Sequence, residues 1–158
     1  MADVYLIRNS LTEGEASEAP VAHRHLSLEG RQLIRAMGQK VRLAEEPSFD
    51  RFITSALAPA VQTAELFADR VDYIGAIEVM PALAASIPPQ IAAAQILARG
   101  SIVAVFADEP ELSALGAFLI GRPTFPLLVH AQVSVITDRK PAWYLRPDTM
   151  ARGPLLVA

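Results

Sequence analysis

The chain has 158 residues, of which 52% are hydrophobic and 20% charged, and its formal net charge at neutral pH is -3. This length fits one folded domain over residues 1–158, and the composition is that of a protein with an apolar core. The acidic balance and the scattered lysines and arginines argue against nucleic acid as a partner, because binding a phosphate backbone needs a concentrated basic face.

Cysteine is absent from the sequence, which excludes disulfides, thiolate chemistry and cysteine-ligated metal. Every apolar stretch is interrupted well before the ~18 residues that a membrane-spanning helix needs. The N-terminal residues lack the basic segment of a signal peptide. We therefore expect a cytoplasmic protein with no membrane partner.

Six short segments have the apolar or alternating pattern of β-strands, and helical patterns separate most of them. The predicted strands are residues 4–7, 52–54, 76–79, 101–107, 132–136 and 142–145. Strands that alternate with helices of moderate length predict a three-layer α/β/α domain. We expect a mainly parallel sheet of five or six strands, with helices on both faces.

The predicted helices have clear start and stop signals. Ser27 is a favourable N-cap for the first helix, and Pro47 marks its end. The second helix should begin within two residues of Pro59, because proline lacks the N–H of a helix interior but suits the first turn. Pro88 and Pro110 are expected to open the third and fourth helices.

Ligands of open α/β sheets bind at the carboxyl ends of the strands. The residues at the carboxyl ends of the predicted strands are therefore the candidates for a functional site. They are Arg8, Asn9 and Ser10 at the first strand, Thr54 and Ser55 at the second, and Ala107, Asp108 and Glu109 at the end of residues 101–107.

Segments around these strand ends resemble the histidine phosphatase superfamily, and most of all its small SixA-type phosphohistidine phosphatases. VYLIRNS resembles the first strand with its Arg-His-Gly signature, and HRHLSLEGRQLIRAMG resembles a segment that ends in an alanine-rich helix. FITSALAPAVQTAELFA resembles Ser-Pro-x-x-Arg-Ala-x-Gln-Thr-Ala-Glu, and VAVFADEPELSALGAFLIG resembles a strand that ends in Gly-His-x-Pro. The order and spacing of these segments imply a phosphoglycerate mutase-like fold.

The resemblance also implies that the catalytic centre is degenerate. The position of the nucleophilic histidine holds Asn9, whose amide nitrogen cannot attack phosphorus. The second histidine is replaced by Asp108, whose carboxylate would repel the phosphoryl oxygens. Pro59 stands at the second phosphate-binding arginine and has no side-chain donor. No catalytic residue of the family mechanism is therefore expected to act here.

Three residues remain as candidate ligand-binding positions, namely Arg8, Arg24 and Ser55. Arg8 could hold a phosphate, or it could pair with Asp108 or with a carboxylate of the 9–18 loop. We expect the Arg8–Asp108 pair, with roughly 3–6 Å between the charged atoms, because each group is otherwise unsatisfied.

The sequence therefore predicts a catalytically inactive SixA-like protein, a pseudophosphatase of bacterial-type signalling that binds a protein partner or a small ligand. Neither a cofactor nor a metal is expected, because His23 and His25 lack a third ligand nearby. One alternative is an active phosphatase for phosphohistidine or another phosphomonoester that uses His23, His25 or Asp108. A second alternative binds a small phosphorylated ligand through Arg8 and Arg24 without turnover. His130 is interpreted as structural.

Overall fold

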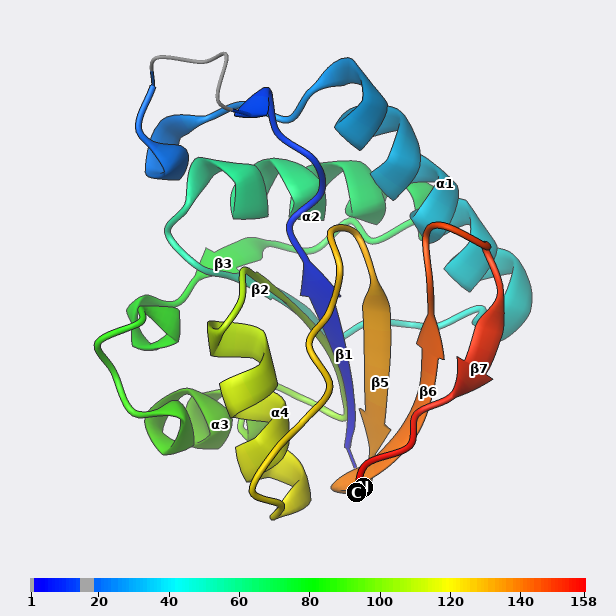
Figure 1. Ribbon diagram of the computed structural model, residues 1–158. Helices are drawn as coiled ribbons and strands as arrows, with labels where there is room; N and C mark the ends of the chain where they lie inside the picture. Colours follow the sequence, from blue (N-terminus) through cyan, green and yellow to red (C-terminus); the bar gives the residue numbers. More distant parts are fainter. Residues whose placement is uncertain (1, 15–18) are drawn as a thin grey trace.

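The computed structural model describes residues 2–14 and 19–158, and within them one sheet of seven strands lies between two layers of helices (Figure 1). The strands are β1 (Asp3–Arg8), β2 (Arg51–Thr54), β3 (Ile77–Val79), β4 (Ile102–Ala107), β5 (Val133–Thr137), β6 (Lys140–Leu145) and β7 (Arg152–Pro154). The helices are α1 (Leu28–Glu45), α2 (Ala58–Arg70), α3 (Pro89–Leu97) and α4 (Glu111–Ile120), with short 3-10 helices η2 (Val21–His23) and η3 (Pro81–Leu83).

The sheet has a parallel half and an antiparallel half. Its strand order is β3-β2-β4-β1-β5-β6-β7, in which β3, β2, β4 and β1 are parallel and β5, β6 and β7 pair antiparallel. The predicted α/β class is confirmed. The predicted five or six strands were too few, because the seventh strand, β7, is short and largely exposed and pairs with β6 alone among the described strands. Such a strand lacks the apolar or alternating pattern from which strands are predicted.

The central strands contribute side chains to both faces of the sheet. Val4 and Leu6 of β1 pack in the cluster formed with α3 and α4, whereas Tyr5 and Ile7 pack in the cluster formed with α1 and α2. Because successive side chains of a strand point to opposite faces, a run that is apolar at every position needs cover on both sides. The two helical layers in Figure 1 supply that cover.

The helices begin and end at the expected signals. The Ser27 side chain accepts a hydrogen bond from the Gly30 N–H at 3.0 Å, so Ser27 caps α1 as predicted. Pro59 lies in the first turn of α2, which confirms the predicted start of that helix. Gly121 ends α4 with a φ of 68°, a left-handed conformation that glycine adopts without strain. Within the described residues, none of the helices is long and apolar enough to cross a membrane.

The loop after β1 packs directly on the first turn of α1. Gly30 permits this contact, since a Cβ at that position would overlap the main-chain carbonyl of Leu11. The Ser10 hydroxyl donates to the Gly30 carbonyl at 2.7 Å, and the Ser27 N–H donates to the Leu11 carbonyl at 3.0 Å. The connection between β1 and α1 is thus anchored to α1, and it includes η2.

Candidate functional site

The carboxyl ends of three neighbouring parallel strands meet at one edge of the sheet. Strand β4 lies between β2 and β1, and Arg8 at the end of β1 is opposite Ala107 at the end of β4. Residues that follow these strands therefore share one edge, where open α/β sheets bind ligands. The side chains at this edge are those of Arg8, Asn9, Ser55 and Asp108.

Arg8 and Asp108 form a direct ion pair. Arg8 Nε donates to Asp108 Oδ1 at 2.8 Å, and Arg8 Nη1 donates to the Leu128 main-chain carbonyl at 2.9 Å. The Glu109 N–H donates to the same Asp108 oxygen at 2.9 Å. The Arg8 and Asp108 side chains are only 22% and 26% exposed, so each charge needs the other as a partner. The predicted pairing is confirmed; residues 15–18, which hold two of the alternative carboxylates, lie outside the described residues.

Asn9 is 2% exposed, and its side-chain oxygen Oδ1 has no hydrogen-bond partner among the described residues. Its main chain is well satisfied. The Asn9 N–H donates to the Ala107 carbonyl at 2.9 Å, and the Asn9 carbonyl lies 2.9 Å from His130 Nδ1. Because a carbonyl oxygen only accepts, His130 Nδ1 is the donor of this hydrogen bond. His130 thus anchors its loop beside Asn9, although the sequence did not place these residues together.

Two residues of the α2 motif hold the loop that follows β1. The Thr63 hydroxyl oxygen accepts the Ser10 N–H at 3.1 Å. Gln62 Oε1 accepts the Leu26 N–H at 2.8 Å, and Gln62 Nε2 lies 3.1 Å from His25 Nδ1. The loop is therefore attached to α2 at both of its ends, and the His25 ring is part of that attachment.

Among the described residues, the remaining candidates Pro59, Arg24 and His23 form neither a hydrogen bond nor an ion pair with Arg8 or Asp108. Pro59 is buried and offers only its main-chain carbonyl, which accepts the Thr63 hydroxyl at 2.6 Å. Arg24 Nε donates to the Ala19 carbonyl at 3.1 Å, within its own loop. His23 ends η2. Across residues 2–14 and 19–158, no three metal-ligating side chains come together.

Glu109 links α4 to the loop that precedes β5, a role that the sequence analysis missed. Its Oε1 accepts the Ser113 N–H at 2.7 Å, and its Oε2 accepts the Leu128 N–H at 2.7 Å. An acidic residue just before a helix is a recognisable capping signal, so the first contact was predictable. The second was not, because Leu128 lies 19 residues further along the chain.

A pocket of about 360 Å³ opens beside Asp108. Its polar lining consists of Ser55, Asp108 and Glu111, and neither Arg8 nor Arg24 is among its lining residues. The rest of its wall is apolar and comes from the segment after β2, from η3 with the residues that flank it, and from the end of β4. The apolar lining residues are Ala56, Leu57, Met80, Pro81, Leu83, Ala84, Ala85 and Ala107.

The chain has the fold of the histidine phosphatases, also called phosphoglycerate mutase-like. The phosphohistidine phosphatase SixA complexed with tungstate matches it with a TM-score of 0.82 and 19% identity, over 94% of this chain and 99% of that one. An Agrobacterium tumefaciens protein assigned to the SixA phosphohistidine phosphatases matches with a TM-score of 0.74 and 18% identity, over 92% and 99%. The α-ribazole phosphatase of Shigella flexneri matches with a TM-score of 0.65 and 17% identity, over 88% and 93%.

At identities below one fifth, these similarities establish the fold and leave the chemistry open. No family model and no curated protein matches the sequence.

Proposed function

We propose that this protein is a SixA-like pseudophosphatase, which does not hydrolyse phosphate esters and uses the scaffold to bind a protein or a small molecule. The observation that carries this proposal is the ion pair between Arg8 Nε and Asp108 Oδ1, 2.8 Å long. In the family that the sequence resembles, both positions flank one phosphoryl group. Here the acid takes the place of that group, and the arginine is already neutralised.

The chemistry of the neighbouring positions supports the same conclusion. The Asn9 amide cannot act as a nucleophile, because its nitrogen lone pair is delocalised into the carbonyl. Pro59 supplies no donor, and Asp108 repels an anion. Loss of one donor in an anion-stabilising site costs about 10²–10³ in rate, and loss of the nucleophile costs more. Three such changes leave no route by the family mechanism.

The two alternatives have less support. Binding of a phosphorylated ligand needs cationic donors directed at the anion, but Arg8 Nε and Nη1 donate to Asp108 and to the Leu128 carbonyl, and Arg24 Nε donates to the Ala19 carbonyl. An unorthodox phosphatase needs a replacement nucleophile. His25 Nδ1 already contacts Gln62, and His130 Nδ1 already contacts the Asn9 carbonyl, so both rings take part in holding their own loops.

A phosphatase assay with a phosphohistidine substrate and with p-nitrophenyl phosphate tests the proposal. We expect no hydrolysis above buffer for the wild type, and none for Asn9→His, because Pro59 and Asp108 still deny the phosphoryl group its donors. The matched variants are His23→Ala, His25→Ala and His130→Ala. Wild-type turnover that survives repeated purification and disappears in one of these variants would overturn the proposal and identify the nucleophile.

The cytoplasmic and signalling setting expected from the sequence stays a prediction, as does the single domain over residues 1–158. Capture of partners from the native cell tests the first of these. A wild-type preparation and an Ala84→Phe variant, which narrows the pocket beside Asp108, make a suitable pair for that capture.

A further inference from the structure

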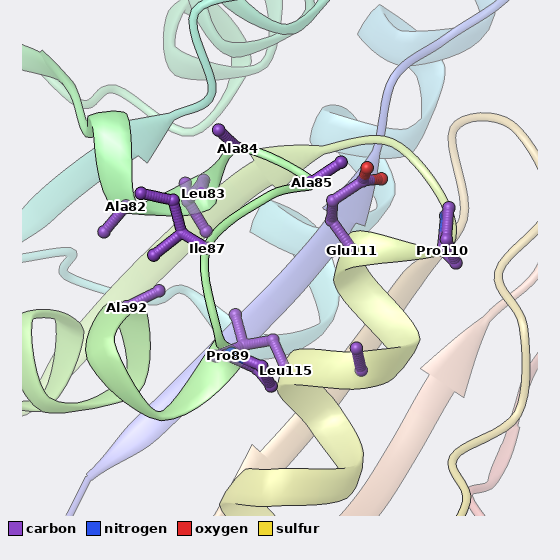
Figure 2. Close-up of a pocket in the computed structure, with 11 residues that line it drawn as sticks. Ala82, Leu83, Ala84, Ala85, Ile87, Pro89, Ala92, Pro110, Glu111 and Leu115 are labelled. Carbon is purple, nitrogen blue, oxygen red and sulfur yellow. The ribbon is translucent and has the colours of Figure 1, made fainter.

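Two adjoining hollows lie on the α3/α4 side of the Arg8–Asp108 pair. The larger, of about 360 Å³, is the pocket beside Asp108, and the smaller, of about 140 Å³, lies between η3 and the first turns of α3 and α4 (Figure 2). Their walls share Leu83, Ala84, Ala85 and Glu111. We call this pair of hollows the η3–α4 pocket. Its larger part alone has the size of a small-molecule site.

The wall of the η3–α4 pocket is mainly apolar, and none of the described residues that line it carries a cationic side chain. Met80, Leu83 and Ala107 are at most 5% exposed and form a buried part of the wall. In the smaller hollow, Ile87 and Leu115 continue the apolar surface, and Glu111 is the one ionisable side chain among those that Figure 2 draws. An apolar ligand would therefore be stabilised by the removal of its apolar surface from water.

Both ionisable side chains of the η3–α4 pocket are carboxylates with unused acceptor capacity. Asp108 Oδ1 accepts from Arg8 and from the Glu109 N–H, whereas no described residue donates to Asp108 Oδ2. The Glu111 carboxylate has neither an ion pair nor a hydrogen bond within residues 2–14 and 19–158. A partly buried carboxylate oxygen without a donor favours a ligand that carries N–H groups.

The charges around the pocket favour a cation over an anion. Arg8 contributes one positive charge, which Asp108 balances, and the carboxylates of Glu109 and Glu111 add negative charge that no nearby cation offsets among the described residues. The N-terminal turn of α4 would ordinarily attract an anion, but the Ser113 N–H is bound to Glu109 and the Leu112 N–H to the Asp108 carbonyl. A phosphate in this pocket would face carboxylates and few free donors.

We infer that the η3–α4 pocket binds a small apolar molecule that carries a protonated amine, with the apolar part against Leu83 and Met80 and the ammonium group beside Glu111 and Asp108. This inference rests on the proposed loss of phosphatase function. It replaces a phosphate-binding site with a site of opposite charge preference at the same edge of the sheet.

Isothermal titration calorimetry with three matched probes tests the inference: 2-phenylethylamine, 2-phenylethanol and phenyl phosphate. We expect the amine to bind about tenfold more tightly than the alcohol, which is the size of one charge-assisted hydrogen bond. Phenyl phosphate should show no binding. Equal affinity for amine and alcohol, no binding of the amine at millimolar concentration, or tighter binding of phenyl phosphate would each overturn the inference.

Variants separate the charge effect from the pocket itself. Glu111→Gln should lower the affinity for the amine about tenfold and leave the alcohol unchanged, whereas Glu29→Gln, an exposed carboxylate on α1, should change neither. Ala84→Phe places a ring at an exposed position of the wall and should abolish binding of both probes. Amine binding that survives Ala84→Phe would place the ligand elsewhere.

The same probes distinguish failure of this inference from failure of the proposed function. Hydrolysis of phenyl phosphate, measured as the release of inorganic phosphate, would contradict the proposed function. Binding of phenyl phosphate without hydrolysis would contradict only the inferred charge preference.

Discussion

Helix α2 carries two kinds of position from the motif that the sequence resembles, and the two behave differently. Gln62 and Thr63 match the motif and hold the loop after β1 through hydrogen bonds of 2.8 Å and 3.1 Å. Pro59, one turn earlier, departs from the motif and offers no donor to the edge where Arg8 and Asp108 pair. The contrast separates residues that fold the scaffold from residues that would contact a phosphate.

The two kinds of residue contribute to the protein under different conditions. The Thr63–Ser10 hydrogen bond is present in every folded molecule. Its loss would leave a buried N–H without an acceptor and lower the free energy of unfolding. A phosphate-binding side chain contributes only while an anion is bound. Under the proposed function, the scaffold stays intact although the site has a different charge, because Arg8 is paired with Asp108.

The largest effect is expected for the residues of α2 that hold the loop after β1. Thr63→Val keeps the volume of the side chain but removes the acceptor of the buried Ser10 N–H, and we expect a loss of about 2 kcal/mol in the free energy of unfolding. Thr63→Ser retains the hydroxyl and should lose clearly less. Urea denaturation of the three proteins measures the difference. If Val and Ser at this position are equally stable, the hydrogen bond does not hold the loop.

A smaller effect is expected when the Arg8–Asp108 ion pair is altered. Asp108→Asn removes the negative charge beside Arg8, and we expect affinity for sulfate to rise about tenfold. The measurement is the rise in melting temperature with sulfate concentration, because a ligand selective for the folded state stabilises it. Arg8→Met added to Asp108→Asn should cancel the gain. A wild-type protein that responds to sulfate as strongly as Asp108→Asn would refute the self-neutralised site.

The smallest effect is expected for the ion-pair cluster of Glu78, Arg51 and Arg99, which lies on and near β3 and serves as a structural comparison for the Arg8–Asp108 pair. Glu78 on β3 accepts from Arg51 Nη1 at 3.0 Å and from Arg99 Nε and Nη2 at 2.9 Å and 2.8 Å. Both of its oxygens are occupied, whereas Asp108 leaves one unused. The hydrogen bond from Arg99 is the main cause that holds the pKa of Glu78 below its ordinary value of 4.5.

Because this pKa is lower in the folded state, the Glu78 cluster stabilises the protein above the unfolded-state pKa and loses that contribution as the pH falls through the folded-state pKa. Glu78→Gln should cost under about 1 kcal/mol near neutral pH, since the pair is partly exposed. The difference from wild type should shrink as the pH falls below the ordinary Glu pKa of 4.5, because the carboxylate then becomes protonated in the folded protein as well. Unfolding curves recorded over a series of pH values on both sides of 4.5 measure it, and a difference that stays constant with pH would show that the carboxylate is not the cause.

Several features could be predicted from the sequence because they depend on residues close together in the chain. The Ser27 cap, the start of α2 at Pro59 and the end of α4 at Gly121 each follow from one residue's conformational preference. The apolar runs of β1 and β4 predicted a sheet covered on both faces. The Arg8–Asp108 pair was also predictable, because the ends of parallel neighbours lie at one edge and opposite charges there need partners.

Other features were decided only by the tertiary structure. Strand β7 exists because β6 offers a free edge, and its three residues carry no strand pattern of their own. His130 meets Asn9 across 121 residues of sequence, and the η3–α4 pocket is enclosed by segments that follow β2, β3 and β4. Local preferences act within a few residues, so they specify helices, caps and strands. The positions of loops that follow different strands depend on how the sheet and the helices pack together. That packing determined which carboxylates line the pocket.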